Sequence, residues 1–249
     1  MKIRKMNGYL SLAVMVLAFA IFGECASVGN PGFLPEKGRY IMGFEYNSVK
    51  GGDLSDSKFG ARPLEPESKQ SLAKIVYGLS DRLSILAKVG SSDLVLWNPN
   101  ASTSYSHSSA LGWGAGFRVI FYEDLGLGLS LGGGAQYFTF EPDKTNDNRT
   151  AELVQWDSSL FMCIVNRIAD ADSYVEPFRL TSTSFYTGAR YSETQIDWTY
   201  GSSSGTLEAD DNFGIFAGFD FVFDDNYIMG IEARFSDEKA YSAVLGFRF

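Results

Sequence analysis

The last nine residues of the chain, 241–249, alternate strictly between two kinds of side chain. In a β-strand, successive side chains point to opposite faces. The apolar set therefore covers one wall completely and runs to the last residue, whereas the chain ends of soluble domains are usually polar and frayed. This pattern predicts a strand with one wall in lipid, as in a transmembrane β-barrel. The apolar set is Tyr241, Ala243, Leu245, Phe247 and Phe249, and the other set is Ser242, Val244, Gly246 and Arg248.

The first 25 residues predict a secretory signal peptide. Three positive charges within the first five residues precede an apolar stretch, 10–22, that contains one serine and no charge. Gly23 and Cys25 occupy the −3 and −1 positions before a predicted cut at Ala26. The apolar stretch is shorter than the roughly 20 residues that a transmembrane helix needs.

A lipid anchor on Cys25 is the alternative to simple cleavage. Glu24 and Phe22 disfavour it, because small residues usually stand beside a lipidated cysteine. With residues 1–25 removed, Cys163 is the one remaining cysteine, so an intramolecular disulfide scaffold is excluded. We predict a short periplasmic segment at 26–37 and a barrel over 38–249.

The composition favours an all-β membrane protein and disfavours nucleic-acid binding. The formal net charge is −9, and no basic stripe accompanies it. Aromatic residues make up 15% of the chain, and there are 26 glycines but one histidine. These features are typical of barrels and not of α/β enzymes.

Alternating segments along the chain predict an all-β fold, a single antiparallel up-and-down transmembrane β-barrel of about ten strands. Eight strands are the alternative, because the sixth and seventh patterns are the weakest. A soluble β-sandwich or lipocalin-like barrel, with its apolar faces inward, is a further alternative. The predicted strands are 39–47, 71–79, 83–90, 111–121, 125–134, 151–165, 174–191, 213–223, 227–235 and the terminal strand after 238.

The connections between these strands alternate between short and long. Short turns are expected near Ser80, Glu123, Ile168 and Asp225, and an even strand number places them on the side of both termini. The long polar loops are expected at the opposite end of the barrel, as in outer-membrane barrels. Aromatic residues gather near both strand ends, where two girdles flank a lipid-facing wall. The predicted long loops are 48–69, 91–109, 141–150 and 199–211.

The terminal Phe249, the hairpin sequence Tyr-Gly-Leu-Ser-Asp-Arg-Leu at 77–83 and the signal peptide resemble small Gram-negative outer-membrane β-barrel proteins of the OmpA, OmpX and OmpW kind. The resemblance implies an outer-membrane location after signal cleavage, with lipid and lipopolysaccharide as neighbours. It also implies that the barrel-assembly machinery reads the last strand as its signal, and it is consistent with a monomer. The residues of that signal are Tyr241, Leu245, Phe247 and Phe249.

If the apolar set faces lipid, the alternate set lines the lumen. Its charges nearly cancel, so we expect them to pair, because isolated charges in a narrow interior are costly. A structural network that fills the barrel is one interpretation, and the charged constriction of a narrow, porin-like channel is the other. The predicted lumen charges are Glu45, Lys74, Lys88, Arg118, Asp157, Arg179, Asp220, Glu232 and Arg234.

Catalytic and cofactor signatures are weak. His107, within Ser-Tyr-Ser-His-Ser-Ser at 104–109, faintly resembles the His-x-Ser of lipid A deacylases when it is taken with Ser109. No orienting acid can be placed beside it, so an exposed loop histidine is the preferred interpretation. Metal-ligand spacing and a phosphate-binding loop are absent from the sequence, and no cofactor is predicted. We predict a non-enzymatic structural or surface-interaction role in the envelope, then a narrow channel, then a lipid- or peptide-acting hydrolase.

Overall fold

The computed structural model describes residues 34–51, 54–56, 64–98, 103–142, 149–168, 174–175, 178–236 and 238–249. The predicted signal peptide and most of the 26–37 segment lie outside these residues. No helix among the described residues is long and apolar enough to cross a membrane. The strands are β1 (Tyr40–Gly51), β2 (Leu54–Asp56), β3 (Glu65–Ser80), β4 (Leu83–Asn98), β5 (Thr103–Asp124), β6 (Leu129–Phe140), β7 (Arg149–Arg167), β8 (Tyr174–Val175), β9 (Phe178–Tyr200), β10 (Ser203–Ala209), β11 (Phe213–Phe223), β12 (Tyr227–Phe235) and β13 (Glu238–Arg248).

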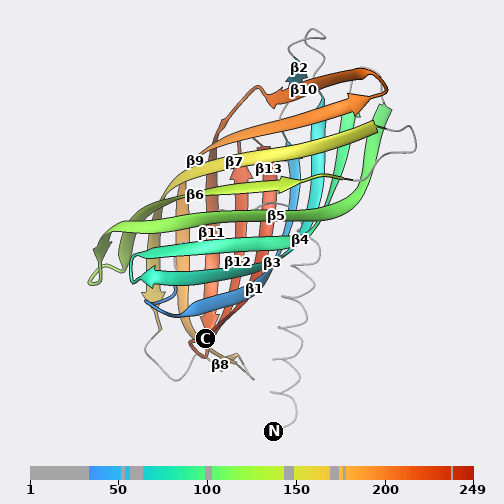
Figure 1. Ribbon diagram of the computed structural model, residues 1–249. Helices are drawn as coiled ribbons and strands as arrows, with labels where there is room; N and C mark the ends of the chain where they lie inside the picture. The colour runs from blue at the N-terminus through green and yellow to red at the C-terminus, as the bar shows by residue number, and fades with distance from the viewer. Residues whose placement is uncertain are drawn as a thin grey trace.

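Ten long strands form a closed antiparallel barrel (Figure 1). Each strand pairs with the next long strand along the chain, and β9 pairs with β11. The last strand returns to the first, because β13 pairs with β1 from Ile41↔Arg248 to Gly51↔Glu238. The predicted up-and-down barrel of ten strands is therefore confirmed, and the weak seventh pattern is the long strand β9.

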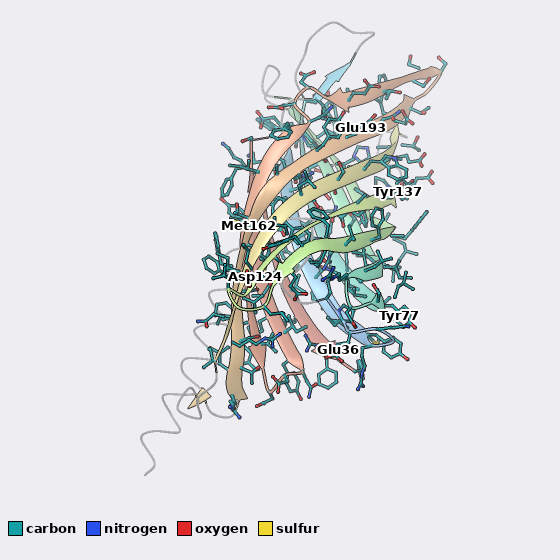
Figure 2. The ribbon with its side chains drawn as sticks, turned by 90° about the vertical axis from the view of Figure 1, so that its left-hand side faces the viewer. Glu36, Tyr77, Asp124, Tyr137, Met162 and Glu193 are labelled. Atoms are coloured by element: carbon teal, nitrogen blue, oxygen red, sulfur yellow. The ribbon has the colours of Figure 1, made fainter. Side chains whose placement is uncertain are left out.

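The outer wall of the barrel is an apolar belt (Figure 2). Along β7, the side chains of Leu160, Met162 and Ile164 are exposed, whereas the alternating Asp157 and Ser159 are buried inside. The same alternation holds on the other strands, so lipid-facing and lumen-facing residues alternate as the sequence predicts. Other exposed apolar side chains of the belt are Met42, Phe44, Ile85, Val89, Phe117, Phe185, Ile215, Phe219, Ile231 and Leu245.

Both described chain ends lie at the barrel end that carries the short turns, which we call the turn end. The backbone N–H of Phe249 donates to the carbonyl of Tyr40 at 2.9 Å. The rings of Tyr40 and Tyr77 stack there with centroids 5.7 Å apart. Glu36, Tyr77 and Asp124 mark this end in Figure 2, and Glu193 lies near the opposite, loop end.

The turn between β5 and β6 differs from its prediction. Glu123 and Asp124 still belong to β5, and the chain turns at 125–128, so Leu125 and Leu127 belong to no strand. The Asp124 carboxylate accepts hydrogen bonds from the N–H groups of Gly126 (2.9 Å) and Leu127 (3.1 Å). Gly128 has φ +63°, a left-handed conformation that glycine adopts without strain. The hydrogen bonds from Asp124 therefore form a turn where the alternating leucines predict a strand.

The predicted long loops at 48–69, 91–109 and 199–211 are also wrong over much of their length. At the loop end, β1 runs to Gly51, β3 begins at Glu65, and β4 and β5 leave only 99–102 between them. β10 occupies 203–209 and pairs with β9, and β2 pairs with β10. We call this loop-end part the extension; it comprises β2, β10 and the ends of the long strands at 65–70, 91–98, 103–111, 149–155 and 192–200.

The extension has the opposite polarity to the barrel below it. On β9, Phe185 faces outward and Ser184 inward within the barrel, but Asp197 is exposed and Ile196 buried within the extension. A polar outer face with an apolar inner face is the pattern of a sheet in water, not of one in lipid. Inner residues of the extension form an apolar core together with three residues of the adjoining barrel, Leu72, Phe138 and Phe140. The members from the extension are Leu54, Leu94, Leu96, Ala151, Leu153, Ile196 and Leu207.

Candidate functional site: the filled lumen

The lumen between the two barrel ends holds a balanced set of buried charges. Among the described residues, five acids and five bases are buried, so the formal charge of the set is zero. Balance of this kind lowers the cost of holding charge away from water, provided that each group has a partner. We call these ten residues the central network: Glu45, Lys74, Lys88, Arg118, Asp157, Arg190, Asp220, Glu232, Arg234 and Glu238.

Glu45 joins two lysines from neighbouring strands. Its two carboxylate oxygens contact the Nζ atoms of Lys74 at 3.0 Å and Lys88 at 2.7 Å. Lys74 and Lys88 are direct cross-strand partners on β3 and β4, a like-charge pair that is destabilising without a counter-charge. Asn47 also donates to Glu45 at 3.0 Å and to Gln70 at 3.2 Å. The carboxylate of Glu45 therefore holds three strands in one register.

Two arginines and two acids form a second group nearer the extension. Arg190 Nη2 contacts Asp157 Oδ1 at 2.7 Å, and its Nη1 pairs with Glu238. Glu238 also contacts Arg234 Nη1 at 3.0 Å. Gln136 donates to the remaining oxygen of Asp157 at 3.0 Å. This group ties β6, β7, β9, β12 and β13 together across the lumen.

The third group surrounds Tyr186, a fully buried residue of β9. Its hydroxyl donates to Glu232 Oε2 at 3.3 Å, and Arg234 Nε lies 3.8 Å from the other oxygen of Glu232. Asp220 accepts a hydrogen bond from Ser184 at 3.2 Å. Arg118 lies within electrostatic reach of Glu45, Glu232 and Asp220, so it connects this group to the first one.

Apolar clusters lie above and below the central network. The core of the extension lies at the loop end. Towards the turn end, Ile120, Phe161, Cys163, Tyr186 and Phe216 form a second cluster, against which Leu34 and Val165 pack. Three small cavities lie among the described residues, the first of them beside Leu54 and Leu153 of the extension core. They measure about 40, 20 and 10 Å³, and the last two adjoin Arg118.

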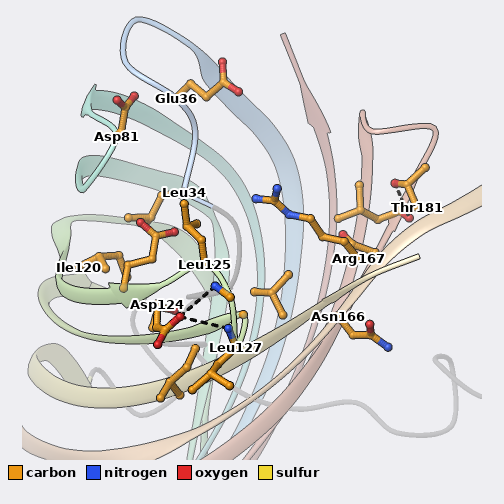
Figure 3. Close-up of a pocket in the computed structure, with 18 of the residues that line it drawn as sticks. Leu34, Glu36, Asp81, Ile120, Asp124, Leu125, Leu127, Asn166, Arg167 and Thr181 are labelled. Atoms are coloured by element: carbon orange, nitrogen blue, oxygen red, sulfur yellow. Dashed lines mark hydrogen bonds between the residues drawn. The ribbon is translucent and has the colours of Figure 1, made fainter. Parts of the chain in front are cut away.

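A much larger cavity of about 810 Å³ opens at the turn end (Figure 3). Its walls include Leu34 from the N-terminal segment, the turn Leu125–Gly128 and Arg167 from β7. Ile120, Ser130, Ser182 and Val222 also line it. The cavity is thus a vestibule, and Leu34, Ile120 and Val165 of the second apolar cluster are among its lining residues.

The predicted lumen residues share the lumen, with one exception. Glu45, Lys74, Lys88, Arg118, Asp157, Asp220, Glu232 and Arg234 are buried there. Arg179 instead lies half-buried at the turn end, where its N–H donates to Asp224 at 3.1 Å. The inward residues of β9 have even numbers, from Ser182 to Ser192, so Arg179 has the wrong parity for the lumen.

Sequence reasoning missed Arg190 and Glu238, which carry the second group. Arg190 follows Ser184, Tyr186 and Gly188 at a period of two, a signal that the uncertain seventh strand obscured. Glu238 lies just before the predicted terminal strand, but in the structure it begins β13 opposite Gly51.

The expectation that His107 is an exposed loop residue is wrong. His107 lies in β5 opposite Leu94 and is 6% exposed, whereas Ser109 is exposed. The pairing of β4 with β5 shifts register between Ser92 and Leu94, and this bulge changes the parity of β5. His107 and Ser109 therefore do not share a face. Among the described residues, no group of three or more His, Cys, Asp or Glu side chains is placed to hold a metal ion.

The residues of the predicted assembly signal line the outside of the closing strand. Tyr241, Leu245 and Phe249 are exposed on the belt, and Phe247 is half-buried. The Phe247 ring contacts Tyr227 and Phe249, with centroids 5.1 and 4.7 Å away.

A closed antiparallel barrel with an apolar outer belt and a polar, filled interior is the outer-membrane type of β-barrel. No protein-family model matches the chain, and no curated protein matches it.

Solved structures with a similar fold are outer-membrane proteins with different roles. OprG from Pseudomonas aeruginosa is 9% identical, with 87% of this chain and 98% of that chain covered and a TM-score of 0.40. The translocator domain of the autotransporter NalP from Neisseria meningitidis is 10% identical, with 85% and 87% covered and a TM-score of 0.44. The outer-membrane protease OmpT from Escherichia coli is 11% identical, with 90% and 99% covered and a TM-score of 0.46. These similarities concern the fold alone.

Proposed function

We propose that this protein is a closed outer-membrane barrel that displays a folded β-sheet extension on the surface of a Gram-negative cell. Its role is structural or one of surface interaction. The observation that carries this proposal is the reversal of side-chain polarity along single strands. Within the single strand β9, the outward-facing side chains change from apolar, as at Phe185, to polar, as at Asp197.

The direction of the barrel follows from its connections. Outer-membrane barrels have short periplasmic turns and longer extracellular parts. The turns at 81–82, 125–128 and 224–226 therefore face the periplasm, together with Phe249. The extension then stands outside the cell, where its core keeps it folded.

The alternative of a narrow channel has less support. Barrels of about eight strands have interiors just wide enough for their own side chains. The three small cavities of about 40 Å³ or less fit this filled type, because at about 10–15 Å³ for a single water each has room for about three waters or fewer. The hydrolase alternative loses its main support because His107 and Ser109 do not share a face.

Surface display is tested by cysteine labelling on intact cells. The native Cys163 is fully buried, so a membrane-impermeant maleimide reports on an introduced cysteine. Glu193→Cys in the extension and Asp81→Cys in a short turn replace exposed acids. We expect Glu193→Cys to label on intact cells and Asp81→Cys to label only after the outer membrane is opened, with the parent protein unlabelled. Labelling of Asp81→Cys alone on intact cells would reverse the proposed orientation.

The closed lumen is tested by conductance of the refolded protein in a planar bilayer, beside an Arg118→Ala variant. Folding is verified by the heat-sensitive gel mobility of each protein. We expect no discrete conductance steps from the parent. Steps that change in size with Arg118→Ala would favour the channel instead.

A further inference from the structure

A ring of aromatic side chains marks the edge of the apolar belt on the side of the extension. On β13, the outward residue Tyr241 lies between Leu245 of the belt and Lys239. On β9, the outward residue Tyr191 precedes Glu193. Aromatic girdles of this kind lie at the interface between membrane and water. We call this ring the loop-end girdle, and its members are Tyr46, Trp113, Tyr137, Trp156, Tyr191 and Tyr241.

The outward residues just beyond the loop-end girdle lie at the height of lipid headgroups. A strand rises about 3.3 Å per residue, so the next outward side chain begins about 6–7 Å farther along the strand. The headgroup region extends about 5–7 Å beyond the hydrocarbon core on each side of a bilayer. Lys239 is the next outward residue beyond Tyr241, and Glu193 is the next beyond Tyr191. The charges at such positions therefore meet the headgroups of the surrounding lipid.

Three lysines gather at this height on three neighbouring strands. Lys239 of β13 is the direct cross-strand partner of Lys50 of β1. Lys69 of β3 is the partner of Ser48, which in turn lies opposite Tyr241 of the loop-end girdle. The strands β13, β1 and β3 are neighbours in the sheet (Figure 1), and all three lysines are exposed on its outer face. We call these three residues the lysine cluster.

The lysine cluster concentrates like charge on one small area. Lys50 and Lys239 lie directly opposite each other, an arrangement that is destabilising for two equal charges. Two carboxylates border the cluster: Glu67 lies 2.9 Å from Lys50, and Asp93 accepts a hydrogen bond from the backbone N–H of Lys69 at 2.5 Å. These five residues together have a positive formal charge. An anion bound beside the pair of opposed lysines would offset their repulsion.

Another part of the same wall has the opposite charge at the same height. Glu193 of β9 lies just beyond Tyr191, and Asp211 lies just beyond Phe213 at the start of β11. Both carboxylates are exposed. Because acidic side chains repel anionic headgroups, this part of the wall is unsuited to them. The barrel therefore has one side, formed by β13, β1 and β3, that favours an anionic lipid.

We propose that the lysine cluster binds the phosphate groups of lipid A, the membrane-embedded part of lipopolysaccharide. The place of the cluster determines the kind of ligand, because its occupant has anionic groups at headgroup height and apolar chains beside Tyr241 and Leu245 of the wall below. Lipid A has this construction, since its phosphates lie on a sugar core that carries the acyl chains. Lysine ammonium groups bind phosphate through charge-assisted hydrogen bonds. The inference rests on the proposed function, which places the loop end in the outer leaflet.

The test is a titration of the refolded protein in detergent micelles with phosphorylated lipid A, with the bound lipid counted by native mass spectrometry. The double variant Lys69→Gln, Lys239→Gln removes two charges of the cluster and keeps the pair of Lys50 with Glu67. A lysine beside an anionic lipid surface contributes about fivefold in affinity, so we expect the Kd for lipid A to rise about 30-fold. An unchanged Kd would overturn the proposal.

A matched control removes the same charge at the other end of the barrel. Lys37 and Arg82 are exposed at the turn end. The double variant Lys37→Gln, Arg82→Gln should change the Kd by about threefold or less, because charges so far from the cluster are screened. Equal weakening by both double variants would mean that net charge alone attracts the lipid, and it would refute the assignment to the cluster.

Two further lipids identify what the cluster recognises. Lipid A without its phosphates should bind the parent and the Lys69→Gln, Lys239→Gln variant equally, because only its acyl chains remain to contact the wall. Phosphatidylglycerol supplies a phosphate on a glycerol backbone, and its Kd should change much less than that of lipid A. If the variant weakens both phosphorylated lipids to the same extent, the cluster is a general site for anionic phospholipid and the assignment to lipid A is wrong.

Folding and orientation are checked separately from binding. Heat-sensitive gel mobility verifies that each variant is folded, and Lys239→Gln alone, with an expected rise of about fivefold, replaces the double variant if that one does not fold. Cysteine labelling of Glu193→Cys on intact cells tests the proposed orientation. The titration measures the lysine cluster whichever way the barrel faces, so a failure of the proposed function and a failure of the lipid A site give different results.

Discussion

Removing the charge of Glu45 is the sharpest test of the central network. Glu45 is fully buried, and its two oxygens lie 3.0 and 2.7 Å from the amines of Lys74 and Lys88. With an effective dielectric constant of about 20, each contact is worth about 5 to 6 kcal/mol before desolvation. Glu45→Gln keeps the size of the side chain but leaves two adjacent buried lysines without their counter-charge. Loss of one member of a buried pair costs about 3–5 kcal/mol, and we expect this loss in the free energy of unfolding.

The chain supplies a matched control for this measurement. Lys50 and Glu67 form an ion pair at 2.9 Å, and their side chains are 53% and 45% exposed. Glu67→Gln should therefore cost about 0–1 kcal/mol, because water screens the pair. Both variants are unfolded by urea in lipid vesicles and followed by gel mobility. If Glu45→Gln costs no more than Glu67→Gln, the reasoning is refuted.

A second variant keeps this test decisive if Glu45→Gln does not fold. Replacing all three residues, as Glu45→Leu, Lys74→Met and Lys88→Met, removes the charges together. Because well-packed apolar groups often replace a buried ion network at no loss, this variant should fold with stability near that of the parent. A triple variant as unstable as Glu45→Gln, or as unable to fold, would contradict the electrostatic account.

Three further substitutions test other parts of the structure. Ile196→Ala removes a fully buried side chain from the core of the extension and should lower the free energy of unfolding by about 2–5 kcal/mol. The control Thr199→Ala, on the exposed face, should change it by about 0.5 kcal/mol or less. Gly218→Ala would place its Cβ against the ring of buried Tyr186 and should lower the free energy of unfolding by about 1–3 kcal/mol in the same urea assay. The control Gly126→Ala should lower it less, because its Cβ meets only Asp124, at 3.3 Å. Phe249→Ser removes an exposed aromatic from the closing strand and should reduce the fraction of heat-modifiable, folded protein in the outer membrane, while Phe213→Ser, an exposed aromatic on β11, should reduce it less.

The barrel itself was predictable because lipid imposes one rule on every strand. Apolar side chains outward and polar ones inward repeat at a period of two, and this pattern located residues such as Ile215 and Glu232 correctly. The extension was not recognised, because in water the same period carries the opposite polarity. Thus Leu94 is buried beside half-buried Asp93 and Ile196 beside exposed Asp197, and a membrane pattern does not predict strands that alternate in this sense.

The partners within the central network could not be predicted, because they depend on register across strands that are distant in sequence. Arg190 pairs with Asp157 across 33 positions and with Glu238 across 48. The β-bulge that turns His107 inward also has no simple sequence signal, because it lies within a run of serines.

The central network places at least one buried charge on nine of the ten barrel strands. In strand order, the buried charged residues are Glu45 on β1, Lys74 on β3, Lys88 on β4, Arg118 on β5, Asp157 on β7, Arg190 on β9, Asp220 on β11, Glu232 and Arg234 on β12, and Glu238 on β13. A strand that slips by one residue turns its inward side chains outward. In this barrel, such a slip would move a charge from the network to the lipid, at about 2–4 kcal/mol for a lysine or arginine at the bilayer midplane. The tenth strand, β6, is bound to the same network through Gln136 and Asp157. The buried charges therefore select one register for the whole barrel, and that register also brings the apolar residues of the extension together at the loop end.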